Sequence, residues 1–170
     1  MTRASGGFAF ENGPAMLYLV DGNNVMALKP GWHRDKAAAR RRLIHDLSVL
    51  VAARRVKVRV VFDGAPDEDF PDGAKYKSVH IFYAKHGSNA DTRIKDMVRR
   101  SSFKRDMVVV SSDRDLSSFA RRQGAKIMAS GQFRRMINAA RASRAEQEPS
   151  RGDGPVDVDE WMDYFDHPES

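Results

Sequence analysis

Apolar residues occur in two kinds of run along the chain. Five short, nearly continuous apolar runs each end in a polar or glycine-containing turn, which is typical of strands buried on both faces. They cover Met16–Val20, Val56–Phe62, Ser78–Ala84, Met107–Val110 and Ala125–Ala129. Between them, apolar residues recur at spacings of three and four, as in an amphipathic helix. This second pattern predicts helices over residues 34–55, from Asp91 onward, over Leu116–Arg122 and over Gly131–Arg144.

The predicted strands and helices mostly alternate, which indicates an α/β sandwich of three layers around a mostly parallel five-stranded sheet. The segment Pro66–Lys77 is rich in Pro, Gly and Asp and has no period, so we expect a mobile loop. A length of 170 residues suits one domain. We place it at residues 16–145. A flexible N-terminal extension (1–15) precedes it, and an acidic linker with a short amphipathic tail helix (146–170) follows.

Charge is unevenly distributed along the chain. Residues 1–145 hold 28 of the 29 Lys and Arg residues but 14 of the 23 Asp and Glu residues, a net charge of +14. Residues 146–170 hold nine acidic residues against Arg151 alone, a net of −8. A basic body favours nucleic acid as partner, because each phosphate contact releases condensed counterions. A solvated arginine-rich surface explains the same excess. The acidic tail is suited to dock on the body or on a protein partner.

The sequence disfavours several kinds of protein. It has no cysteine, which rules out disulfides, Cys nucleophiles and Cys-ligated metals. A phosphate-cradling loop of the form GxxxxGK[ST] is missing, which argues against ATP hydrolysis. No apolar run approaches the ~20 residues of a membrane-spanning helix, and residues 1–15 lack the features of a secretory signal. We therefore expect a cytoplasmic protein without membrane contacts.

Acidic residues follow the predicted strands. In a parallel sheet, ligands bind beyond the carboxyl ends of the strands, where the strand order reverses. The acids expected at that edge are Asp21, Asp63, Asp91, Asp113 and Asp115. Carboxylates close together repel one another unless a cation neutralises them. An all-oxygen ligand set without His or Cys suits Mg²⁺ or Mn²⁺.

Each of these acids also has a plain structural explanation. Asp21 can close a turn onto the backbone, and Asp63 is better explained by a turn than by ligation. The other three suit the first turn of a helix, where the dipole favours acids. Their common edge therefore carries the metal-site prediction. The candidate ligands are Asp21, Asp91, Asp113 and Asp115. Residues next to these ligands could hold metal-bound waters. The candidates are Asn24, Ser111, Ser112 and Asp63.

Four segments together resemble the NYN domain of the PIN-like nuclease superfamily. They are Leu19–Asn24, Val60–Asp63, Ala90–Asp91 at a helix start, and Val109–Asp113, in this order and spacing. The resemblance covers residues 16–145 and is to the YacP-like branch, whose members are similar to ribosome-associated endoribonucleases that cut mRNA. It implies a PIN-like Rossmannoid fold with strand order 3-2-1-4-5.

The resemblance also implies roles for single residues. Asp21 and Asp91 match the acids most closely tied to cleavage in the family, Asp113 matches a metal-site acid, and Asn24 belongs to the DGxN motif. Asp115 has no counterpart. The acidic tail departs from the YacP-like C-terminus, which leaves open how the protein would dock on a ribosome.

Our hypothesis is metal-assisted hydrolysis of RNA phosphodiesters, with Asp21, Asp91 and Asp113 as catalytic acids. We expect a set of cations near the same edge to guide the RNA backbone. They are Lys75, Lys77, Lys85, Arg93 and Arg114. Arg40, Arg41 and Arg42 are expected to lie away from the site or to face the ribosome. One alternative is a non-catalytic RNA- or ribosome-binding module with a degenerate site. Another is a hydrolase of small phosphoesters, which usually has a DxD pair where this chain has Asp21 and Asn23.

Overall fold

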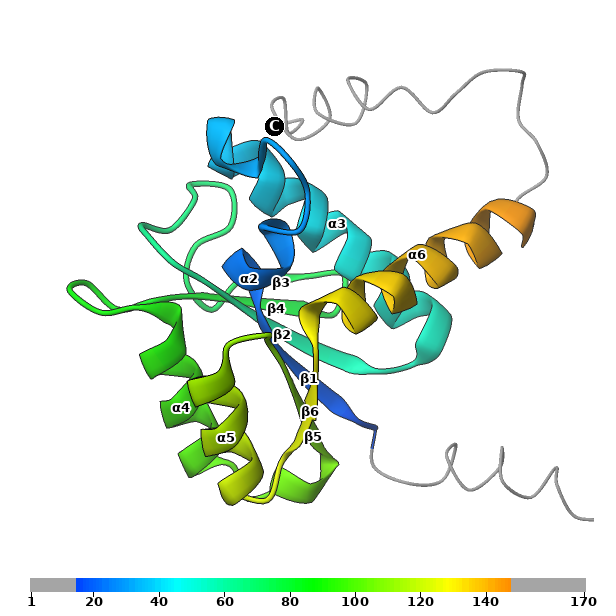
Figure 1. Ribbon diagram of the computed structural model, residues 1–170. Coiled ribbons are helices and arrows are strands. Elements are labelled where there is room, and N and C mark those ends of the chain that lie inside the picture. Colours follow the sequence, from blue (N-terminus) through cyan, green and yellow to red (C-terminus); the bar gives the residue numbers. More distant parts are fainter. Residues whose placement is uncertain (1–14, 148–170) are drawn as a thin grey trace, which may run out of the picture.

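The computed structural model describes residues 15–147, which form strands and helices around one sheet (Figure 1). In chain order the elements are β1 (Leu17–Asp21), α2 (Gly22–Met26), the 3-10 helix η1 (Trp32–Arg34), α3 (Lys36–Arg54), β2 (Lys57–Phe62), β3 (Lys75–Tyr76), β4 (Val79–Tyr83), α4 (Ala90–Arg100), the 3-10 helix η2 (Lys104–Asp106), β5 (Met107–Val110), α5 (Arg114–Arg122), β6 (Lys126–Met128) and α6 (Ser130–Gln147). The predicted tail helix and nearly all of the predicted N-terminal extension lie outside the described residues. Of the predicted linker, Glu146 and Gln147 are described, and both belong to α6.

The sheet has six strands in the order β3-β4-β2-β1-β5-β6. The five predicted strands are parallel to their neighbours and keep the predicted order among themselves. The prediction of five strands is nevertheless wrong by one. Lys75 and Tyr76 form β3, which pairs antiparallel with His80 and Val79 of β4. The segment predicted as a mobile loop therefore adds an edge strand, because pairing with β4 supplies the order that the segment's own composition lacks.

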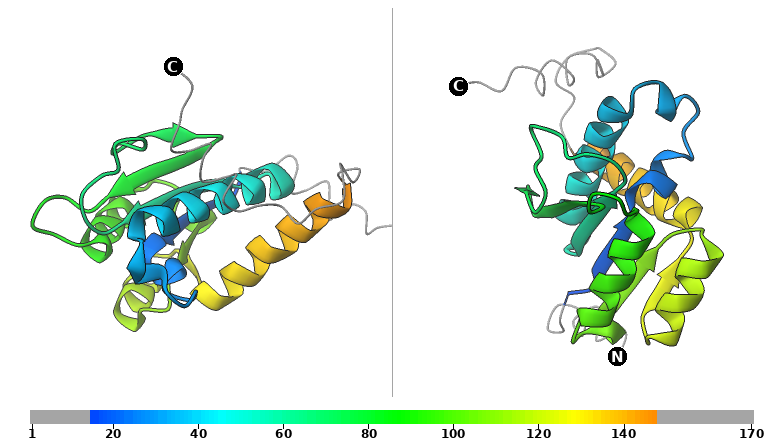
Figure 2. Two further views of the ribbon diagram at one scale, coloured as in Figure 1. Left: turned by 90° about the horizontal axis from the view of Figure 1, so that it is seen from above. Right: turned by 90° about the vertical axis from the view of Figure 1, so that its left-hand side faces the viewer.

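Alternate residues of the strands face opposite helical layers. Val20 and Val60 pack in one core with residues of α3 and α6, whereas Leu19 and Val61 pack in a second core with residues of α4 and α5. Figures 1 and 2 show α2, α3 and α6 on one side of the sheet and α4 and α5 on the other. All four residues of β5 are buried, as expected for a strand covered on both faces. The predicted three-layer sandwich is confirmed.

Polar side chains fix where several helices begin. Asp35 Oδ1 accepts a hydrogen bond from the Ala38 amide (3.0 Å) at the start of α3, and Asn89 Oδ1 accepts one from the Thr92 amide (2.9 Å) at the start of α4. Such caps satisfy donors that have no partner within the helix and contribute about 1 kcal/mol each. Asp21 caps α2, a short helix where the sequence predicts a turn. The ends of the parallel strands and the starts of these helices share one edge of the sheet, hereafter the carboxyl edge.

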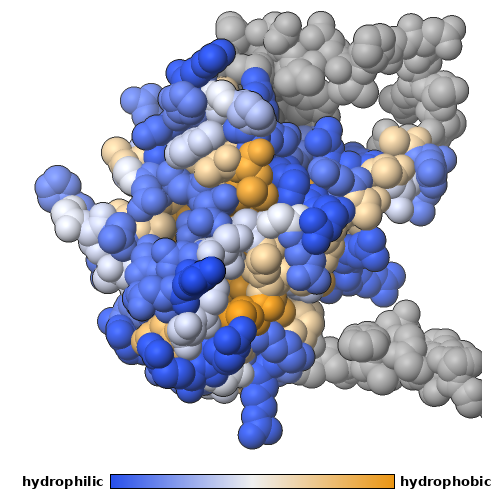
Figure 3. All heavy atoms as spheres, in the orientation of Figure 1, coloured by the Kyte–Doolittle hydropathy of each residue, from blue (hydrophilic) through white to orange (hydrophobic). Residues whose placement is uncertain are grey.

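The surface is largely polar. Figure 3 shows one face of the molecule as mostly hydrophilic, with only small hydrophobic areas. Within residues 15–147, no helix has both the length and the apolar character needed to cross a membrane.

Candidate active site

The site begins where β1 and β5 end side by side. These strands pair in parallel with Val20 opposite Val110, so the next residues, Asp21 and Ser111, emerge together at the carboxyl edge. The Ser111 hydroxyl donates to Asp21 Oδ2 (3.1 Å) and accepts a hydrogen bond from the Asp113 amide (3.1 Å). Ser111 therefore fixes Asp21 relative to the loop that carries Asp113. The strand order reverses at this pair of strands, as expected for a ligand site in such a sheet.

Asp21 is held in a confined position. The amide of Asn24 donates to Asp21 Oδ1 over 3.4 Å. A Cβ on the next residue, Gly22, would lie 2.5 Å from the buried ring of Phe62, so only glycine fits there. Burial raises the pKa of Asp21 to about 6, opposed by the hydrogen bonds from Ser111 and Asn24. The negative charges of Asp63 and Asp91 raise it further.

Three of the four predicted ligands meet in one cluster. Carboxylate oxygens of Asp91, Asp113 and Asp115 all lie within 4.8 Å of one another. Asp91 comes from the first turn of α4, while Asp113 caps α5, its Oδ1 accepting from the Leu116 amide (2.9 Å). Asp115 lies in the first turn of α5. Asp21 is not a member of this group, so the predicted set of four is divided into a cluster of three and a neighbouring carboxylate.

Lys95 joins the acidic cluster. Its ammonium lies 3.0 Å from Asp91 Oδ2 and 2.5 Å from Asp115 Oδ2, and hydrogen bonds to Asp115 and Asp91 raise the pKa of Lys95. The same contact lowers the pKa of Asp115. Sequence reasoning missed Lys95. The available signal is its position four residues after Asp91 on a helix, a spacing that favours an ion pair.

The donor set of the cluster fits a divalent metal ion. Its three residues offer only carboxylate oxygens, the ligands preferred by Mg²⁺ and Mn²⁺. Asp91 Oδ1 is buried and has no hydrogen-bond partner in the described part of the chain. Leaving a buried carboxylate oxygen unsatisfied is costly, and a bound cation would remove that cost.

Comparison with known proteins places the chain in a family. The model of the YacP-like NYN domain matches residues 18–158. The chain belongs to the YacP-like NYN family. Two crystal structures of Rae1 (YacP) from Bacillus subtilis share the fold, one of them a mutant with a single substitution. The mutant aligns with a TM-score of 0.63 at 19% identity, covering 88% of this chain and 91% of that one. The other aligns with a TM-score of 0.60 at 20% identity, covering 88% and 86%. No curated protein matches.

In this YacP-like chain, Asn24 links the carboxyl edge to α6. Its Oδ1 accepts hydrogen bonds from the Ser112 amide (2.9 Å) and from the Ser130 hydroxyl, and Ser112 Oγ accepts from the Ser130 amide (3.1 Å). The amide oxygen of Asn24 and the hydroxyl of Ser112 are thus engaged by protein donors, whereas the prediction has them holding water. Ser130, which starts α6, was not among the predicted site residues, because only the folded chain brings it to Asn24.

Asp63 organises the start of α4. Its Oδ1 accepts a hydrogen bond from the Ala90 amide (2.7 Å), and its own amide donates to Asn23 Oδ1 (3.0 Å). Asp63 therefore links β2 to both α2 and α4, next to Asp91. Asp63 thus connects structural elements beside the acidic cluster, and its role in holding metal-bound water stays a prediction.

The five predicted RNA-binding cations divide into three groups. Lys85, after β4, and Arg114, next to Asp113, are exposed at the carboxyl edge. Arg93 donates to Asp72 Oδ1 (2.7 Å) and to the Tyr83 carbonyl, so it joins α4 to β4. The expectation for Lys75 and Lys77 is wrong. They lie in β3 and in the turn that precedes β4, toward the amino end of that strand, because the chain reverses direction between β3 and β4.

The predicted remoteness of the α3 arginines is also partly wrong. Arg40 donates to the carbonyl oxygens of Asp63 (2.5 Å) and Ala65 (3.2 Å), so it braces the loop that follows β2 beside the site. Arg41 pairs with Asp69 at 3.1 Å and Asp67 at 3.5 Å. Arg42 is exposed and lines a cavity treated below.

Proposed function

We propose that this chain is a metal-dependent endoribonuclease that hydrolyses phosphodiester bonds of mRNA in the cytoplasm. The observation that carries the proposal is the meeting of Asp91, Asp113 and Asp115 within 4.8 Å, beside Asp21, on a basic domain. Membership of a nuclease-like family supports it. RNA is the substrate that the charge excess of the body favours.

The residues of the site would divide the work. Asp91, Asp113 and Asp115 would hold Mg²⁺ or Mn²⁺, and Asp21, oriented by Ser111, adds the fourth carboxylate. When bound, such an ion increases the acidity of water and offsets the charge that develops on a phosphodiester. Lys85 and Arg114, which are exposed at the carboxyl edge, would contact RNA phosphates. This chemistry needs no side-chain nucleophile.

One observation favours a second candidate function, an RNA-binding module without catalysis. Lys95 already pairs with Asp91 and Asp115, and an ammonium in that place neutralises acids that would otherwise recruit a metal ion. Under this alternative, the acidic cluster only stabilises the packing of α4 against α5.

A cleavage assay separates the two candidates. Purified protein is incubated with single-stranded and structured RNA in Mg²⁺, in Mn²⁺ and in chelator. The variant Asp91→Asn is tested beside Asp106→Asn, an acid of η2 at the opposite edge of the sheet. We expect cleavage in either metal, none in chelator, and a loss specific to Asp91→Asn with RNA affinity retained. Absence of cleavage by the native chain in every metal would reject the proposal in favour of the binding module.

The ribosome is tested in a second arm of the same experiment. Translating ribosomes loaded with mRNA replace the free RNA, and the cleavage products are mapped. Cleavage confined to ribosome-bound mRNA would support ribosome-dependent action. Equal cleavage of free and bound mRNA would restrict the proposal to a general endoribonuclease.

A further inference from the structure

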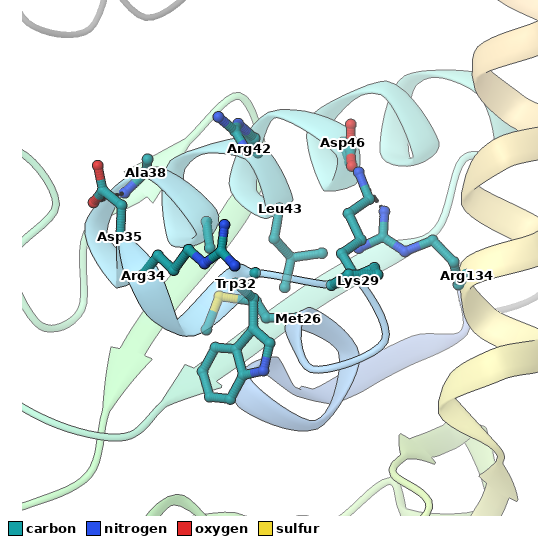
Figure 4. Close-up of a pocket in the computed structure, with 13 residues that line it drawn as sticks. Met26, Lys29, Trp32, Arg34, Asp35, Ala38, Arg42, Leu43, Asp46 and Arg134 are labelled. Atoms are coloured by element: carbon teal, nitrogen blue, oxygen red, sulfur yellow. Dashed lines mark hydrogen bonds and ion pairs between the residues drawn. The ribbon is translucent and has the colours of Figure 1, made fainter.

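A cavity of about 220 Å³ lies on the α3 and α6 side of the carboxyl edge, between these helices and the loop that follows α2 (Figure 4). Met26, Leu43 and Trp32 give it apolar walls, and Lys29, Arg34 and Arg42 bring positive charge to it. No residue of the acidic cluster lines this cavity. It is therefore a separate feature of the molecule.

The cavity carries an excess of positive charge that its own acids do not balance. Asp46, 4% exposed, is ion-paired with Arg134 at 2.9 Å and with Arg141 at 3.5 Å. Lys29 and Arg42 line the same cavity as Asp46. Burial lowers the pKa of Lys29, Asp46 opposes this, and the neighbouring arginines add to the lowering. The lining thus holds four cations, Lys29, Arg34, Arg42 and Arg134, against two acids, Asp35 and Asp46, an excess of positive charge that attracts an anion.

Arg134 is held ready for such an anion. Its side chain is 12% exposed, and one terminal nitrogen is fixed by Asp46. Its Nε is buried and has no hydrogen-bond partner in residues 15–147. A buried guanidinium donor without an acceptor is costly, and a phosphate oxygen is the acceptor that arginine binds best.

The cavity is close to the acidic site along a continuous set of contacts. Asn24 of α2 holds Ser130, the first residue of α6, and Arg134 is four residues further along α6. At about 1.5 Å of rise per residue, these four residues separate the Asn24 contact from the arginine by about 6 Å along the helix axis. Met26, two residues after Asn24, forms the cavity wall on the other side. The acidic cluster and the cavity both lie at the carboxyl edge, so an RNA strand that crosses this edge would pass both.

We propose that this cavity binds a nucleotide of the RNA strand beside the bond that is cut, with its phosphate on Arg134 and the exposed Arg34 and Arg42, and its nucleoside against the apolar wall. The inference rests on RNA being the substrate proposed above. The cavity volume of about 220 Å³ limits the occupant to no more than one nucleotide, since pockets that enclose larger ligands have volumes of roughly 300 Å³ or more.

The test compares two variants that lose the same charge. Arg34→Gln/Arg42→Gln removes two exposed arginines of the cavity, and Arg105→Gln/Arg121→Gln removes two exposed arginines remote from it. Affinity for a fluorescent single-stranded RNA is measured in chelator, so that no cleavage occurs. We expect roughly tenfold weaker binding and a salt dependence reduced by about one to two units for the cavity pair only. Equal weakening by both pairs would overturn the inference.

A second measurement identifies the ligand. The Nε–H resonance of Arg134 is followed by NMR while RNA or inorganic phosphate is added at matched ionic strength. A shift with RNA that phosphate alone does not reproduce is expected. An equal shift with phosphate would reduce the cavity to an anion site and overturn the nucleotide assignment. The inference and the proposed function can fail separately. If Arg34→Gln/Arg42→Gln weakens RNA binding but the native chain never cleaves RNA, only the nuclease proposal is rejected. If the native chain cleaves RNA but Arg34→Gln/Arg42→Gln binds it as tightly as the native chain, only the cavity inference is rejected.

Discussion

Two charged centres on the same edge of this domain have opposite compositions. At the acidic site, three carboxylates meet, and Lys95 pairs with two of them, Asp91 and Asp115. At the cavity, the buried carboxylate of Asp46 pairs with two arginines, and Lys29 lies in its field. The two also differ in burial, since Asp46 is buried whereas Asp113 and Asp115 are exposed. Each centre is left with an excess of one sign. A cation can balance the first and an RNA phosphate the second, so both excesses are expected of a protein that brings metal and RNA together.

The largest expected effect is on catalysis. Asp113→Asn keeps an N-cap for α5, because asparagine caps as well as aspartate, but removes one charge from the cluster. Metal-ion catalysis supplies several kcal/mol, and each 1.4 kcal/mol is tenfold in rate, so we expect activity to fall by about a thousandfold. The measurement is the cleavage rate at saturating Mn²⁺ beside Asp106→Asn. A loss of less than tenfold would remove Asp113 from the site.

The next effect is on stability, at the other centre. Asp46→Asn leaves the mostly buried guanidinium of Arg134 without its counter-ion. Breaking a buried pair in this way typically costs about 3–5 kcal/mol. Urea unfolding measures it, with Asp96→Asn as the control, because Asp96 pairs with the exposed Arg100. The control should change the free energy of unfolding by less than about 1 kcal/mol. Equal effects would show that the buried pair contributes no more than a surface one.

A smaller effect of the opposite sign is expected at Asp21. Its folded-state pKa of about 6 lies above the ordinary pKa of an aspartate, 3.8, so the folded protein binds this proton more tightly than the unfolded chain. In metal-free protein, the contribution of Asp21 to stability is therefore greatest at low pH and falls between about pH 4 and pH 6. Asp21→Asn should remove this loss and raise the free energy of unfolding above pH 7 by about 1–3 kcal/mol in chelator. A difference between variant and native chain that is independent of pH would contradict the assignment.

The smallest effect concerns the cation inside the acidic cluster. Lys95→Met removes the ammonium from Asp91 and Asp115 without shortening the side chain greatly. We expect Mn²⁺ to bind severalfold more tightly, because metal and lysine compete for the same carboxylates. Calorimetric titration measures the affinity, with Lys104→Met on η2 as control. Weaker Mn²⁺ binding would show that Lys95 orients the acids instead of competing.

More of the fold than of the site could be predicted from the sequence. Buried strands have continuous apolar runs, so the five parallel strands are predictable from the sequence pattern. Their order is expected only from the resemblance to the NYN domain. Lys75–Tyr76 has no such run, since β3 forms only through its pairing with β4. The acids at strand ends are predictable for the same reason as the strands. Cations are harder to place, because a lysine close to a strand in sequence can lie at either end of that strand. Lys77 is expected at the carboxyl edge but lies toward the amino end of β4. Contacts between distant segments, such as Asn24 with Ser130, leave no periodic signal at all.

Gly22 and Asp21 are neighbours in the chain, but different physical factors determine which residue type each position accepts. The ring of Phe62 leaves no room for a side chain at Gly22, so the fold itself demands glycine there. Asp21 caps α2, but its burial disfavours ionisation, and under the proposed function its carboxylate is kept for the chemistry. Relatives that retain the glycine but replace the aspartate are therefore expected to fold normally and to have lost cleavage. This pair of positions offers a way to sort active from inactive members of the family by sequence.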